Sequence, residues 1–293
     1  MVALAAPSAA TLLRPAFDPA FALLIGLLGV GYVLLGRAAR ARHPDQPWTV
    51  GRSWAFGLGL VALGIATLSG LARYDTALFS IHMLQHLLIG MVAPLLLALG
   101  APMTLALQGS SRTGQVALLR VLDHPIARVL THPLVAWSLF SLSLFVVYTT
   151  PLFGLALRDD LVHAGLHLHF LAAGFLFCWS VVGVDVGRRR TSHAARLLAV
   201  ALTIPFHALL GLVLQAGASD PLGAAELGAV DRTWGGSLVS DQRTGASLLW
   251  GLGELWGVVL VLLVAASWMR DETRRQARED ARLDAALEAE ADL

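Results

Sequence analysis

Long apolar runs follow one another along almost the whole chain, and they decide what it can fold into. Of the 293 residues, 56% are hydrophobic and only 14% are charged. About 20 consecutive apolar residues suffice for a helix to span a bilayer, and this composition is typical of integral membrane proteins. The runs predict an all-α polytopic bundle of about seven transmembrane helices, at residues 17–36, 54–71, 78–99, 134–148, 161–182, 197–217 and 246–269.

Arginine positions predict how the bundle sits in the membrane. The first, third and fifth loops and the tail hold most of the arginines, among them Arg188, Arg189 and Arg190 in the fifth loop. Because such loops stay in the cytoplasm, we expect an outward N-terminus and a cytoplasmic C-terminus. Residues 1–269 would form the transmembrane domain, with an interfacial helix at about 112–130, and residues 270–293 a charged cytoplasmic tail.

The net charge, the cysteine count and the catalytic motifs limit which classes of function are compatible with the sequence. The net charge is +1, with the charges in loops and the tail, so nothing indicates a nucleic-acid partner. Cys178 is the only cysteine, which excludes an internal disulfide and a cysteine-based metal cage. The sequence has no His-Glu-x-x-His motif, which disfavours a zinc-dependent hydrolase, and we expect no enzyme activity.

Histidines lie inside the predicted spans at a spacing that suggests a site. His82 and His86 are four residues apart in the third span, as are His163 and His167 in the fifth. Residues four apart share a helix face, so each pair can point toward the bundle centre. The predicted topology places these histidines and two further residues in the outer half of the membrane: His82, His86, His163, His167, His207 and Glu254.

Buried ionisable groups in a bilayer cost a few kcal/mol each unless they are paired. A single intramembrane histidine commonly bonds one helix to another, but two pairs at one depth favour a metal or haem site. Glu254 would carry protons, bind the metal or hold an imidazole in place. The roles of His169, Met83 and Met91 stay open, because methionine in a membrane helix is usually filler.

The same residues resemble a known family. The stretch HMLQHLLIGMVAPLLLALGAP, residues 82–102, is similar to a His-x-x-x-His helix and the Ala-Pro and Gly-Ala-Pro elements of the CtaG-type cytochrome c oxidase assembly factors, which are multi-span bacterial membrane proteins. The resemblance continues in the family's order at HAGLHLHFLAAGFLF (163–177), PFHALLG (205–211) and DQRTGASLLWGLGEL (241–255).

The resemblance implies a multi-pass protein of the bacterial inner membrane that helps haem-copper oxidases mature. Its partners would be the oxidase catalytic subunit or other assembly factors, and its suspected cargo is copper. A histidine site without cysteine suits copper in transit, because it need not grip as tightly as thiolates. We expect copper at His82, His86, His163, His167 and His207.

Three polar residues are expected to support this site, and two other classes of function remain. Glu254 would orient an imidazole or balance charge, while Asp241 and Gln242 at the outer mouth would guide the ion or contact the partner.

In one alternative the paired histidines bind b-type haem in an electron-transfer protein. In the other the histidines only join the helices of a membrane scaffold.

Overall fold

The computed structural model describes residues 4–12, 14–183, 192–230, 232 and 234–291. Three loop arginines used to predict orientation, Arg188, Arg189 and Arg190, lie outside these ranges. Throughout the described ranges the regular structure is helical, without strands, which confirms the predicted all-α class.

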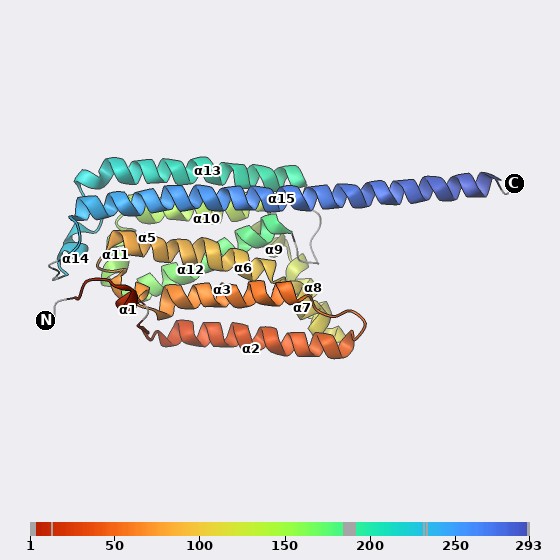
Figure 1. The fold of residues 1–293 in the computed structure, drawn as a ribbon, viewed down its shortest axis with the longest axis horizontal. Helices are drawn as coiled ribbons and strands as arrows, with labels where there is room; N and C mark the ends of the chain where they lie inside the picture. The colour runs from red at the N-terminus through yellow and green to blue at the C-terminus, as the bar shows by residue number, and fades with distance from the viewer. Residues whose placement is uncertain (1–3, 13, 184–191, 231, 233, 292–293) are drawn as a thin grey trace.

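Long helices run side by side and form the body of the molecule (Figure 1). They are α2 Pro19–Arg42, α3 Val50–Leu68, α5 Phe79–Leu87 with η1 Leu88–Val92 and α6 Ala93–Leu99, α10 Pro133–Thr149, α12 Asp160–Val182, α13 His193–Ala216 and α15 Leu238–Ala291. Shorter elements connect them: α1 Ala9–Leu12, α4 Leu71–Tyr74, α7 Pro102–Gly109, α8 Arg112–Asp123, α9 Pro125–Leu130, α11 Leu152–Arg158, η2 Gly217–Ser219 and α14 Ala224–Gly228.

Six helices within the described residues are long and apolar enough to cross a membrane. The pair α10 and α11, bent by 78°, makes a seventh if it counts as one span, in agreement with the predicted bundle. Large apolar side chains such as Leu23, Leu212 and Leu262 lie exposed on the outside of these helices. Such a surface suits lipid, which is as apolar as the side chains themselves. The predicted orientation of the termini stays a prediction.

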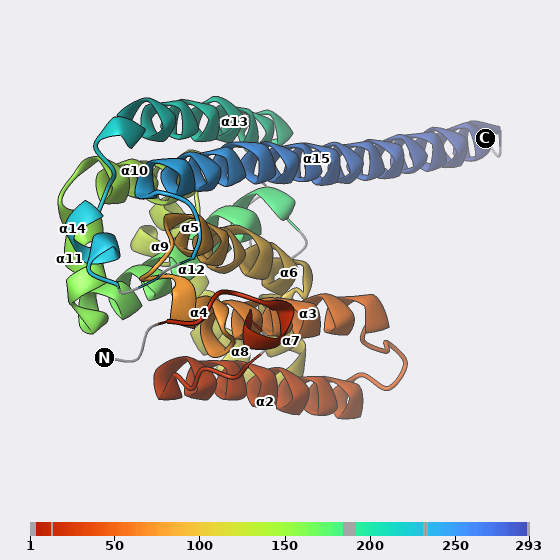
Figure 2. The ribbon, with the colours of Figure 1, turned by 60° about the vertical axis from the view of Figure 1, so that its left-hand side comes forward.

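The two ends of the bundle have different structural elements. The N-terminal segment, α11 and α14 gather at one end, whereas α15 projects far beyond the bundle at the other (Figures 1 and 2). The predicted charged tail therefore continues the last span as helix, as far as Ala291. The predicted helix at 112–130 is present as α8 and α9, and the two parts meet at His124. Its position at the membrane surface stays a prediction.

Close packing at two glycines holds α12 against the third span. A Cβ atom on Gly174 would lie only 2.1 Å from the carbonyl oxygen of Gly90. Pro94 has no N–H to donate to that oxygen, and the chain widens into the π-helical turn η1 immediately before it. Small residues let membrane helices approach closely, and this contact therefore fixes how near α5 and α12 lie to each other.

Candidate metal centre

Four histidines from two helices come together inside the bundle. His82 and His86 lie on α5, with ring centroids 4.1 Å apart, and His163 and His167 lie on α12, 4.3 Å apart. Across the interface, His82 lies 5.5 Å from His163, and His86 lies 5.2 Å from His167. The two predicted pairs therefore face each other, and we call these four residues the histidine cluster.

The nitrogen atoms of the histidine cluster are buried and largely without partners. Both ring nitrogens of His82, and Nε2 of the other three histidines, have no hydrogen-bond partner at normal distance and angle in the described structure. His82 is only 1% exposed and His167 only 7%. Buried polar atoms normally find partners, so these atoms are available for a ligand. Candidate ligand atoms of His82, His86 and His163 all lie within 4.8 Å of one another.

Tyr148 on α10 supports the cluster from one side. Its hydroxyl lies 3.1 Å from Nδ1 of His86, and both side chains are buried. Partners of this kind set the tautomer and the orientation of a metal-binding imidazole, and here they leave Nε2 of His86 for the cluster. Tyr148 could not be predicted from the sequence, because an aromatic residue in an apolar span carries no distinguishing signal.

Asp75, in the short connection between α4 and α5, is a second residue of the site that was not predicted from the sequence. Its Oδ2 lies 3.8 Å from Nε2 of His163. Candidate ligand atoms of Asp75, His163 and His167 lie within 4.8 Å of one another. Burial raises the pKa of Asp75 to about 7, although a hydrogen bond from the Gln85 side chain opposes this shift.

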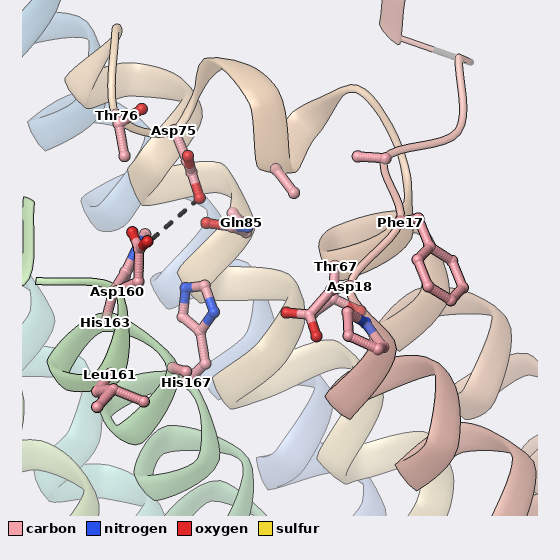
Figure 3. Close-up of a pocket in the computed structure, with 14 residues that line it drawn as sticks. Phe17, Asp18, Thr67, Asp75, Thr76, Gln85, Asp160, Leu161, His163 and His167 are labelled. Atoms are coloured by element: carbon pink, nitrogen blue, oxygen red, sulfur yellow. Dashed lines mark ion pairs between the residues drawn. The ribbon is translucent and has the colours of Figure 1, made fainter.

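A cavity of about 510 Å³ opens onto this side of the cluster (Figure 3). We call it the vestibule. Its polar wall is formed by the N-cap of α2, by residues from the end of α3 through α5, and by the first part of α12: Asp18, Thr67, Asp75, Thr76, Gln85, Asp160, His163 and His167. The vestibule therefore lies between His163 and His167 of the histidine cluster and the segment that precedes α2 (Figure 3).

The structure does not bring His207 or Glu254 into the cluster. The His207 ring on α13 packs against Phe140 and Trp256, with centroids 6.1 and 6.3 Å away. Gly253 approaches so closely that a Cβ atom there would lie 2.9 Å from Nδ1 of His207. Glu254 instead accepts a hydrogen bond of 2.9 Å from the indole of Trp250 on its own helix.

Asp241 and Gln242 hold helices together near the start of α15. Asp241 accepts hydrogen bonds from the backbone N–H of Phe79, at 2.6 Å, and from the hydroxyl of Ser80. These bonds satisfy donors at the N-terminus of α5, which has no side-chain cap of its own. Gln242 accepts from the Leu222 N–H and donates to the Leu214 carbonyl. Their predicted role in guiding an ion stays a prediction.

The residues whose roles the sequence left open, Met83, Met91 and His169, lie near the histidine cluster. Met83 and Met91 are buried and, together with His86, line a small apolar cavity next to Phe140. The His169 ring packs 5.6 Å from that of Phe170. The two methionines place sulfur atoms near His86. His169 is absent from the candidate metal-binding groups of the described residues.

Together, the fold and this site define a class of protein: a polytopic helical membrane protein with a histidine cluster whose Nε2 atoms are buried and have no hydrogen-bond partner among the described residues. Residues 30–271 match the model of the cytochrome c oxidase caa3 assembly factor family. The chain therefore belongs to that family, as the resemblance in its motifs predicted.

Three similar proteins come from mycobacteria. It is 34% identical over 269 residues to uncharacterized proteins of Mycobacterium bovis and Mycobacterium tuberculosis, which covers 88% of this chain and 40% of each relative. It is also 34% identical over 270 residues to an uncharacterized protein of Mycobacterium leprae, covering 90% of this chain. The chain thus spans about 40% of the length of these curated relatives. No solved structure matches it.

Proposed function

We propose that this chain helps to assemble a haem-copper cytochrome c oxidase by binding copper at the histidine cluster and delivering it to the catalytic subunit. The observation that supports this function is the set of buried imidazole nitrogens without partners on α5 and α12. Family membership supports the assembly role, while the donor atoms support the cargo.

The donor set fits copper. Neutral imidazole binds copper well, and a cluster without thiolate holds the ion less tightly than a cysteine cage, which suits delivery. His82, His86 and His163 would hold the ion, and small ring rotations would bring their nitrogens to bonding distance. Tyr148 would keep the His86 ring oriented through Nδ1. Because protons compete with copper for imidazole, binding should weaken as the pH falls.

A scaffold of structural histidines has less support. Histidines that only join helices should donate and accept hydrogen bonds across the interface. Apart from the bond between His86 and Tyr148, the described structure gives the four rings no such bond at Nε2, and none at either nitrogen of His82. The unpaired atoms are therefore better explained by a ligand.

Copper analysis of the detergent-purified protein tests the proposal. We expect wild-type protein to keep copper after passage through a chelating resin, and the variants His82→Gln and His86→Gln to lose it. His169→Gln is the matched control, because it removes an imidazole from α12 without touching the cluster. Copper retained equally by all three variants would exclude this site. A Soret band in the purified protein would instead indicate bound haem.

A further inference from the structure

We infer that the vestibule ends in a second, outer metal position formed by Asp75, His163 and His167, from which a divalent ion moves inward to His82 and His86 while it stays bound to His163. The inner position is that of the proposed function, on which this inference rests. The outer position adds a carboxylate ligand and a route of access.

The geometry of the outer position resembles that of the inner one. Ligand atoms of Asp75, His163 and His167 lie within 4.8 Å of one another, the same limit that the inner group meets. His163 belongs to both groups. Its ring is nearly parallel to that of His82, at 13°, with centroids 5.5 Å apart. An ion bound at His163 is therefore within a short displacement of either set of ligands.

Unpaired polar atoms in the wall of the vestibule point independently to a ligand there. Gln85 is fully buried, and its Oε1 has no hydrogen-bond partner, although its Nε2 donates to the Ala66 carbonyl at 3.0 Å. Nε2 of His167 is also unpaired, and His167 is 7% exposed. Both residues line the cavity (Figure 3). These acceptors suit a cation and its remaining water molecules.

The charge of the vestibule favours a cation over an anion. Asp18, Asp75 and Asp160 line it, and no arginine is among its lining residues in the described part of the chain. A cleft lined by charges of one sign concentrates the oppositely charged ion and speeds its capture. Carboxylate with imidazole suits divalent metals, whereas an all-imidazole set favours copper over harder ions.

Transfer between the two positions is an exchange of ligands. The ion loses its bonds to the Asp75 carboxylate and to His167, keeps its bond to His163, and gains bonds to His82 and His86. No electron moves and no covalent bond of the protein changes. Capture from solution is thereby separated from tight retention, because Asp75 belongs only to the first step and His82 only to the second.

Loading kinetics with Cu²⁺ test this inference on the whole detergent-purified chain. We expect Asp75→Asn to reach the wild-type final copper content but to load about tenfold more slowly, and Asp75→Glu to recover much of the rate. His82→Gln should capture Cu²⁺ at the wild-type rate, with an oxygen ligand visible by electron paramagnetic resonance, yet lose it to a chelating resin.

Asp159→Asn is the matched control, because it removes a carboxylate from the same end of α12 without lining the vestibule. An asparagine oxygen can still accept the hydrogen bonds that Asp159 receives from Leu161 and Val162. Equal loading rates for wild type, Asp75→Asn and Asp159→Asn, with copper still lost from His82→Gln, would overturn the outer position alone. A wild-type protein that binds no copper would overturn the proposed function as well.

Discussion

The hydroxyl of Tyr148 lies 3.1 Å from Nδ1 of His86, so a residue of α10 holds a ring of α5 and leaves its buried Nε2 without a hydrogen-bond partner in the described part of the chain. Tyr148→Phe removes only this hydroxyl. We expect copper affinity to fall about 10- to 100-fold, because outer partners of metal-binding histidines contribute this much, while the copper content at saturation stays the same. Competition with a chelator of known affinity measures the change.

Tyr32→Phe is the control for that variant. Tyr32 is also buried, and its hydroxyl donates to the Gly100 carbonyl at 2.9 Å, at the end of α6, away from the cluster. The Tyr32→Phe variant should lower the stability of the protein without changing its affinity for copper. Equal affinity in wild type and Tyr148→Phe would show that the tyrosine does not orient His86.

Gly174→Ala should separate the two helices that carry the cluster. The added Cβ atom would lie 2.1 Å from the Gly90 carbonyl oxygen, so the backbones must move apart. Overpacking of this kind costs about 1–3 kcal/mol, and we expect both a lower unfolding temperature and weaker copper binding.

Gly165→Ala provides the comparison on the same helix, because a Cβ atom there meets nothing within 4 Å. Thermal unfolding in detergent and a copper titration measure the two effects. If Gly174→Ala behaved like Gly165→Ala in both, the close contact would not set the distance between α5 and α12.

Arg196→Gln should destabilise the bundle at the end away from the cluster. The buried guanidinium of Arg196 donates to the carbonyls of Val181 and Val182, at 2.5 and 2.8 Å, and so satisfies the C-terminus of α12. Leaving such carbonyls unpaired costs about 1–3 kcal/mol. Thermal unfolding should show the loss, whereas Arg120→Gln, on the exposed side of α8, should leave the unfolding temperature unchanged.

His207→Gln should leave tightly bound copper unchanged. The His207 ring lies among Phe140, Trp256 and the backbone of Gly253, outside the candidate metal-binding groups of the described residues. Copper analysis beside His86→Gln checks this. Loss of copper from both variants would place His207 in the site, as its depth in the predicted span suggests.

Hydropathy and helical spacing were sufficient to predict the spans and the two histidine pairs. An apolar run of bilayer length has few alternatives to a helix, and a separation of four residues fixes a shared face whatever the neighbours are. The predicted third span, 78–99, and the observed segment Phe79–Leu99 therefore agree within a residue.

Other parts of the site could not be predicted, because depth in the membrane says nothing about direction around the helix axis. His207 and Glu254 share the predicted depth of the cluster, yet one packs among aromatic rings and the other bonds Trp250. Asp75 lies in a connection outside the spans, so only the fold brings it to His163.

The bonds from Phe79 and Ser80 to Asp241 also set an order of events during synthesis. The helix that carries His82 and His86 takes its N-terminal acceptor from α15, which the ribosome makes some 160 residues later. Until α15 has formed, the N-terminus of α5 lacks this acceptor, and the positions of His82 and His86 along the bundle are not yet fixed. Nascent chains that stop before residue 241 should therefore hold metal poorly, even though all of the cluster has already been translated.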